Sequence, residues 1–95
     1  MAKSITGRNE IGSVALCAGS GGSVLKNVDA DVYLTGEMSH HDILAAGAKG
    51  VHVILCEHSN TERGFLTHLL RKLVSKFPNV DTQIASTDRD PLTIV

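Results

Sequence analysis

The stretch VHVILC, residues Val51 to Cys56, decides the fold that we expect. It is an apolar run rich in β-branched residues that follows Gly50 and stops at Glu57-His58. A run this short, bounded by turn or polar residues, is typical of a β-strand that is buried on both faces. We therefore expect a strand here, with Glu57 and His58 at its carboxyl end.

Three further runs have the same character, namely Val14 to Ala18, Val32 to Leu34 and Thr82 to Ser86. Helical segments lie between the runs. The clearest extends from Phe65 to Phe77, where apolar residues repeat at steps of three and four and Pro78 follows. A second covers Ile43 to Ala48 and is closed by Gly50, and a short third covers Ser23 to Val28. The order βαβαβαβ predicts an α/β fold with three layers and a mainly parallel sheet.

Composition restricts the chain to one small domain. The 95 residues carry nine Lys and Arg against ten Asp and Glu, 42% hydrophobic residues and no Trp. This balance argues against direct binding of nucleic acid, and no run approaches the roughly 20 apolar residues of a membrane span. We expect a polar N-terminal extension at 1–12 and a single α/β domain at 13–95. Two cysteines without CxxC spacing favour a reducing, intracellular compartment over a disulfide framework.

Polar segments follow the predicted strands. In a parallel sheet, ligands bind beyond the carboxyl ends of the strands, so these segments are expected to meet at one edge. They are Gly19 to Ser23, Gly36 to Asp42 and Glu57 to Gly64, and Thr87 to Asp90 follows the last predicted strand.

The pair His58 and Glu62 is a candidate metal site at this edge. Residues four apart on a helix share a face, and an imidazole nitrogen with a carboxylate oxygen suits zinc, iron or manganese. The alternative is structural. Ser59 and Glu62 have the spacing of a capping box, in which Glu62 folds back on the start of the helix. The spacing alone leaves both interpretations open.

The segment from Glu37 to Asp42 offers a similar choice. Ser39 is a good N-cap with Asp42 three residues later. In the functional interpretation, Glu37, His40 or His41 reaches the pocket as an acid or base, or as a group bonded to a metal ligand. Adjacent residues on a helix diverge by about 100°, so at most one of the two histidines faces a given site.

Gly19, Ser20, Gly21 and Gly22 follow the first predicted strand and open a helix, so their backbone N–H groups are candidates for a phosphate cradle. The segment departs from the G-x-G-x-x-G pattern at Val24, and no Lys-Ser or Lys-Thr follows as in a P-loop. A tight turn close to a polar ligand is all that it supports. His52, at the start of a strand, is expected to be structural.

Four stretches together resemble the C-terminal part of the NIF-three-like family, whose members are also described as GTP cyclohydrolase I type 2-like or dinuclear metal-centre proteins. They are VALCAGSGGSVL at 14–25, DVYLTGEMSHHDILAA at 31–46, VILCEHSNTERGFL at 53–66 and TDRDPL at 87–92. By this resemblance His58 and Glu62 fall at the family's C-terminal pair of metal ligands. It also implies two metal ions (zinc, iron or manganese) per complete site, and places Glu37, Ser39, His40 and His41 on the pocket rim.

The family's other ligands, a paired His motif and an Asp, come from an N-terminal portion that nothing in residues 1–13 matches. His58 and Glu62 are therefore expected to be half of a site. The resemblance also implies toroidal oligomers for full-length members, and an exposed sheet edge favours self-association here.

The resemblance implies a metal-dependent hydrolase or GTP cyclohydrolase-like enzyme acting on a phosphate-bearing small molecule. The alternative is a non-catalytic regulatory or adaptor protein, because eukaryotic members are linked to transcriptional regulators. A metal chaperone or sensor is a third hypothesis. We expect the chain in the cytoplasm, in the nucleus or in mitochondria, without membrane contact.

Overall fold

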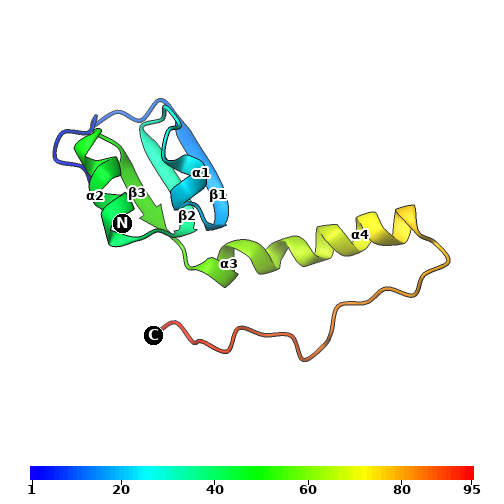
Figure 1. The fold of residues 1–95 in the computed structure, drawn as a ribbon. Helices are drawn as coiled ribbons and strands as arrows, with labels where there is room; N and C mark the ends of the chain where they lie inside the picture. Colours follow the sequence, from blue (N-terminus) through cyan, green and yellow to red (C-terminus); the bar gives the residue numbers. More distant parts are fainter. The chain divides into compact units, whose positions relative to one another are not determined.

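The computed structural model describes all 95 residues, which form two compact units, 1–61 and 62–95. The first unit contains β1 (Val14–Ser20), α1 (Gly22–Leu25), β2 (Val32–Glu37), α2 (His40–Ala48) and β3 (His52–Leu55). Helix α3 (His58–Glu62) follows β3, and after it come a 3-10 turn (Arg63–Phe65), α4 (Leu66–Lys76) and a C-terminal segment without helix or strand (Figure 1). No helix is long and apolar enough to cross a membrane.

The three strands form a parallel sheet in the order β1-β2-β3. Val14 pairs with Val32, and Tyr33 pairs with both Ala15 and Val53. The prediction of an α/β unit with parallel strands is therefore confirmed for the first three runs. Helix α2 ends at Lys49 and Gly50, which has a φ of +85°, so the predicted closure by glycine is confirmed as well.

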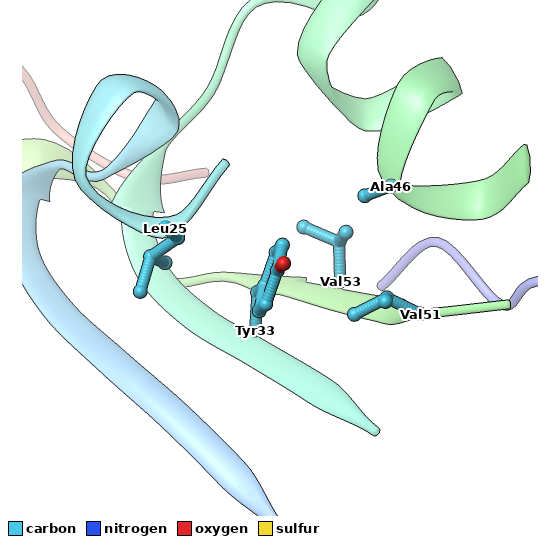
Figure 2. Packing of buried hydrophobic residues seen from close by; sticks show 5 residues of the cluster. All are labelled: Leu25, Tyr33, Ala46, Val51 and Val53. Carbon is cyan, nitrogen blue, oxygen red and sulfur yellow. The ribbon is translucent and has the colours of Figure 1, made fainter. Parts of the chain in front are cut away.

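The core lies on one face of this sheet. Tyr33 and Val53 are 2% and 1% exposed, and Leu25 of α1 and Ala46 of α2 pack against them together with Val51 (Figure 2). Right-handed crossovers between strands placed in the order 1-2-3 bring both connecting helices to the same face. The tyrosine hydroxyl donates to the carbonyl of Val28 at 2.6 Å, and burial raises the pKa of Tyr33.

The opposite face of the sheet carries neither α1 nor α2, and only the first turn of α3 comes close to it, at Gly36. Val14 and Leu16 project from it and are 55% and 73% exposed. The crossover rule that places α1 on the face of Tyr33 also places α2 there, and the three-layer arrangement stays a prediction.

The N-terminal residues contact β3 and the start of β2. Ala2 forms an antiparallel bridge with Val53, with N–O distances of 2.7 and 2.9 Å, and Ser4 is buried. Farther along, the Asp31 carboxylate accepts hydrogen bonds from the N–H groups of Gly12 and Ser13 at 2.9 and 3.0 Å. The bond from Gly12 is the main reason that the pKa of Asp31 lies below its usual value.

The second unit contains α4, close to the helix predicted at 65–77, and a C-terminal segment without a strand. The prediction of a fourth strand at 82–86 is wrong. A strand needs a neighbouring strand to satisfy its backbone groups, and residues 82–85 instead line a groove with the apolar side chains of Leu66, Leu69, Leu70 and Leu73 of α4.

Candidate functional site

The segments after β1, β2 and β3 meet at the carboxyl edge of the sheet, as the sequence predicts. The N–H of Gly21 donates to the carbonyl of Glu37 at 3.2 Å, and the N–H of Gly19 donates to Thr61 Oγ1 at 2.8 Å. The loop after β1 is thereby bonded to the end of β2 and to the helix that follows β3.

His58 and Glu37 form the central contact of this edge. Glu37 is the last residue of β2 and His58 is the first residue of α3, and Nδ1 of the histidine lies 2.9 Å from Oε1 of the glutamate. Their side chains are 44% and 56% exposed. A carboxylate can only accept, so Nδ1 carries the proton of this bond. Such a partner fixes the ring and directs the other nitrogen, Nε2, to a different ligand.

The backbone of His58 lies close to β2 because residue 36 is glycine. A Cβ atom on Gly36 would stand 2.8 Å from Cα of His58 and 2.6 Å from the carbonyl oxygen of Gly19. The turn before His58 passes through Glu57, which has a φ of +69°. The close approach of α3 to the sheet is what lets the imidazole reach the carboxylate of Glu37.

Sequence reasoning missed the two residues that make this approach possible, Gly36 and Thr61. The signal for Gly36 was available, since a glycine inside a buried strand often marks a close backbone approach. Thr61 gave no such signal, because its partner Gly19 is 42 residues away in the sequence.

Glu62 is the last residue of α3, four positions after His58. The alternative interpretation as a capping box places Ser59 just before the helix, whereas α3 begins at His58 and Ser59 is its second residue. The role of Glu62 as a metal ligand stays a prediction.

Ser39 caps α2, as predicted. Its hydroxyl accepts a hydrogen bond from the N–H of Asp42 at 3.1 Å. The same hydroxyl donates to the Asp42 carboxylate at 2.7 Å. His40 and His41 are the first two residues of α2 and are both exposed, with ring centroids 6.1 Å apart in an edge arrangement. Their role in catalysis stays a prediction.

The glycine-rich segment forms the predicted passage from strand to helix, with β1 ending at Ser20 and α1 beginning at Gly22. Two of its N–H groups, those of Gly19 and Gly21, are bonded within the protein. A Cβ on Gly21 would overlap the hydroxyl of Thr35, so this glycine allows close packing. The phosphate cradle formed by Gly19, Ser20, Gly21 and Gly22 stays a prediction.

In the second unit, Arg63 forms an ion pair with Asp88 of the predicted TDRDPL motif. The hydrogen bond to Asp88 raises the pKa of Arg63. Over the whole chain, no group of three or more His, Cys, Asp or Glu side chains is arranged to hold a metal ion.

Comparison with known proteins places the chain among longer relatives. The model of the family described as Duf34/NIF3 (NGG1p interacting factor 3) matches residues 2–91. NIF3-like protein 1 of Mus musculus is 61% identical over 92% of this chain and 23% of its own length. Protein NIF3 homolog of Schizosaccharomyces pombe is 58% identical over 90% of this chain and 32% of its own length. The chain therefore spans about a quarter to a third of these relatives.

A solved structure is similar to this chain in fold. The crystal structure of TTHA1606 from Thermus thermophilus is similar at a TM-score of 0.64 and 33% sequence identity. The match covers 77% of this chain and 30% of that one.

Proposed function

The chain belongs to the Duf34/NIF3 (NGG1p interacting factor 3) family, and on that premise we propose that it supplies half of a divalent-metal site, with His58 and Glu62 as ligands. The metal is zinc, iron or manganese, and a complete site holds two ions. The remaining ligands come from a protein portion outside this chain, since metal sites in proteins use three or four protein donors.

The observation that carries this proposal is the hydrogen bond between Glu37 and His58, at 2.9 Å. Histidines that bind metals commonly donate their second ring N–H to a carboxylate, which orients the ring and raises its basicity. The half-exposed setting of both side chains keeps this edge accessible to an ion. The donor chemistry at His58 therefore fits a borderline-soft divalent metal.

Glu62 supports the same assignment through its position. It ends α3 four residues after His58, and side chains at this spacing share one face of a helix. An imidazole and a carboxylate from one helical turn give a compact pair of donors.

The activity that we propose for the complete protein is metal-dependent hydrolysis, of the GTP cyclohydrolase I type 2-like kind. A bound metal lowers the pKa of its water and polarises the substrate. Within this chain, Glu37, His40 and His41 are the proposed proton-transfer groups, and Gly19 to Gly22 the proposed contact for a phosphate-bearing small molecule. The exposed rings of His40 and His41, at the start of α2, suit an exchange of protons with solvent.

A second candidate function is that of a non-catalytic adaptor. The family description names an interaction with NGG1p, which is a statement about the member so named. The exposed side chains of Val14 and Leu16, on the face of the sheet away from α1 and α2, favour contact with a protein partner or with a second copy of the chain. An adaptor binds its partner equally well when His58 is replaced, whereas hydrolysis is lost.

The test is a zinc titration of the purified chain and its His58→Ala variant, followed by calorimetry and by NMR of the histidine rings. We expect the replacement to weaken zinc binding by more than about 100-fold, beyond the effect of losing an outer partner. The control is His68→Ala, which removes an exposed histidine of α4. Zinc binding that is equal in His58→Ala and in the unchanged chain would overturn the site assignment.

A further inference from the structure

Thr61 makes two hydrogen bonds with one hydroxyl group. It donates to the carbonyl of His58, three residues earlier in α3, at 2.8 Å, and it accepts the N–H of Gly19 at 2.8 Å. A threonine on a helix readily bonds a carbonyl of the preceding turn, which leaves its lone pairs directed outward. One side chain thus joins the end of β1 to the helix that carries His58.

Gly19 needs this partner because it lies where β1 leaves the regular ladder. The pairing of β1 with β2 shifts between Cys17 and Ser20, and Gly19 has a φ of +69°. A residue at such an irregularity loses its ladder hydrogen bonds. Two threonine hydroxyls replace them: Thr61 accepts the N–H of Gly19, and Thr35 donates to its carbonyl at 3.1 Å.

The same network fixes the distance between α3 and β2. A Cβ on Gly36 would lie 2.8 Å from Thr61 Oγ1, as close as it would lie to Cα of His58. The first turn of α3 therefore lies against Gly36 and is bonded to the neighbouring Gly19. In this arrangement Nδ1 of His58 lies 2.9 Å from Oε1 of Glu37.

We propose that Thr61 is a positioning residue for His58: its bridge to Gly19 holds the first turn of α3 where the imidazole meets Glu37 and directs Nε2 outward. This inference rests on the proposed metal role of His58. Binding sites need their side chains held within about 0.5 Å of the working geometry. Loss of the bridge leaves the Gly19 N–H without its acceptor and releases α3 from β1.

The test compares Thr61→Val, which removes the hydroxyl at nearly constant shape, with Thr61→Ser, which keeps it. The matched control is Asn60→Ala, an exposed position of the same helix. Two readouts are used: zinc affinity by calorimetry, and the ring ¹⁵N shifts of His58 in the metal-free chain, which report the bond to Glu37. Circular dichroism and thermal melting establish that each variant is folded.

We expect Thr61→Val to move the His58 ring signals toward those of an unpaired histidine and to weaken zinc binding about 10- to 100-fold, the range for a lost partner of a ligand. Thr61→Ser and Asn60→Ala should behave as the unchanged chain. A folded Thr61→Val protein with unchanged ring signals would overturn the proposal. Thr61→Ala, which leaves room for a water at Gly19, replaces the valine variant if that one does not fold.

The two proposals fail in different ways. If zinc does not bind at His58 at all, the proposed function fails, whereas the ring signals of the metal-free chain still decide whether Thr61 positions His58. If His58 binds zinc but its ring ¹⁵N shifts are unchanged in Thr61→Val, only the positioning role of Thr61 fails.

Discussion

Strand β3 begins at one histidine, His52, and is followed by another, His58, and the two side chains have opposite kinds of hydrogen-bond partner. His52, its first residue, is 5% exposed, and both ring nitrogens bond to the backbone: Nδ1 accepts the N–H of Ser4 at 3.1 Å, and Nε2 donates to the carbonyl of Arg8 at 2.8 Å. His58, beyond the carboxyl end, is 44% exposed and bonds a carboxylate. Backbone partners at both nitrogens make a histidine structural, whereas a carboxylate at one nitrogen prepares the ring for a ligand.

The same difference separates the two ends of the sheet. At the amino ends, the side chains of Asp31 and His52 accept hydrogen bonds from backbone N–H groups of the N-terminal residues. At the carboxyl ends, the parallel strands bring together side chains from three loops, and these remain partly open to solvent. The side chains at the amino ends of the strands therefore stabilise the fold, whereas those at the carboxyl ends form the candidate site.

The largest effect on stability is expected from His52→Ala. This replacement empties the space of a buried side chain and removes the partners of the buried Ser4 N–H and the part-buried Arg8 carbonyl, at a cost of about 2–4 kcal/mol in the free energy of unfolding. His58→Ala, at a partly exposed position, should change that free energy by less than about 1 kcal/mol. Urea denaturation of the two variants measures both values. A larger loss of unfolding free energy in His58→Ala than in His52→Ala would contradict the assignment of His52 as the structural histidine.

A smaller effect is expected from Glu37→Gln, and on metal affinity rather than on stability. The amide keeps the shape of the side chain but removes the charge that strengthens His58 as a donor, so zinc affinity should fall about 10- to 100-fold. Calorimetry on the folded variant measures it. Glu57→Gln, which changes an exposed carboxylate next to His58, serves as the control. Equal affinities in the two variants would show that Glu37 has no part in the site.

The sequence predicts the part of the fold that depends on local pattern. Apolar runs ended by polar residues located β1, β2 and β3, and the parallel order followed from the helices between them. Ser39 and Gly50 marked the ends of α2, because capping depends on a few neighbouring residues.

The errors concern features that depend on distant partners. Residues 82–86 have the pattern of a strand but no strand beside them in their unit, and the pattern cannot supply one. Ser59 has capping chemistry, yet the turn through Glu57 starts α3 one residue before it. For the site, position at the strand ends predicted the neighbourhood of Glu37 and His58, but not the bond between them. That bond depends on Gly36 and on the bridge from Thr61 to Gly19, whose partners are separated by 42 residues.

The central claim is that His58 binds a divalent metal through Nε2 while Glu37 holds Nδ1. Crystals of the chain soaked in zinc, with diffraction recorded on both sides of the zinc absorption edge, test it most directly. The account predicts an anomalous peak about 2.0–2.1 Å from Nε2 of His58, with Glu37 still bonded to Nδ1. A peak at Nδ1 with Glu37 displaced, or zinc bound only at other residues, would contradict it.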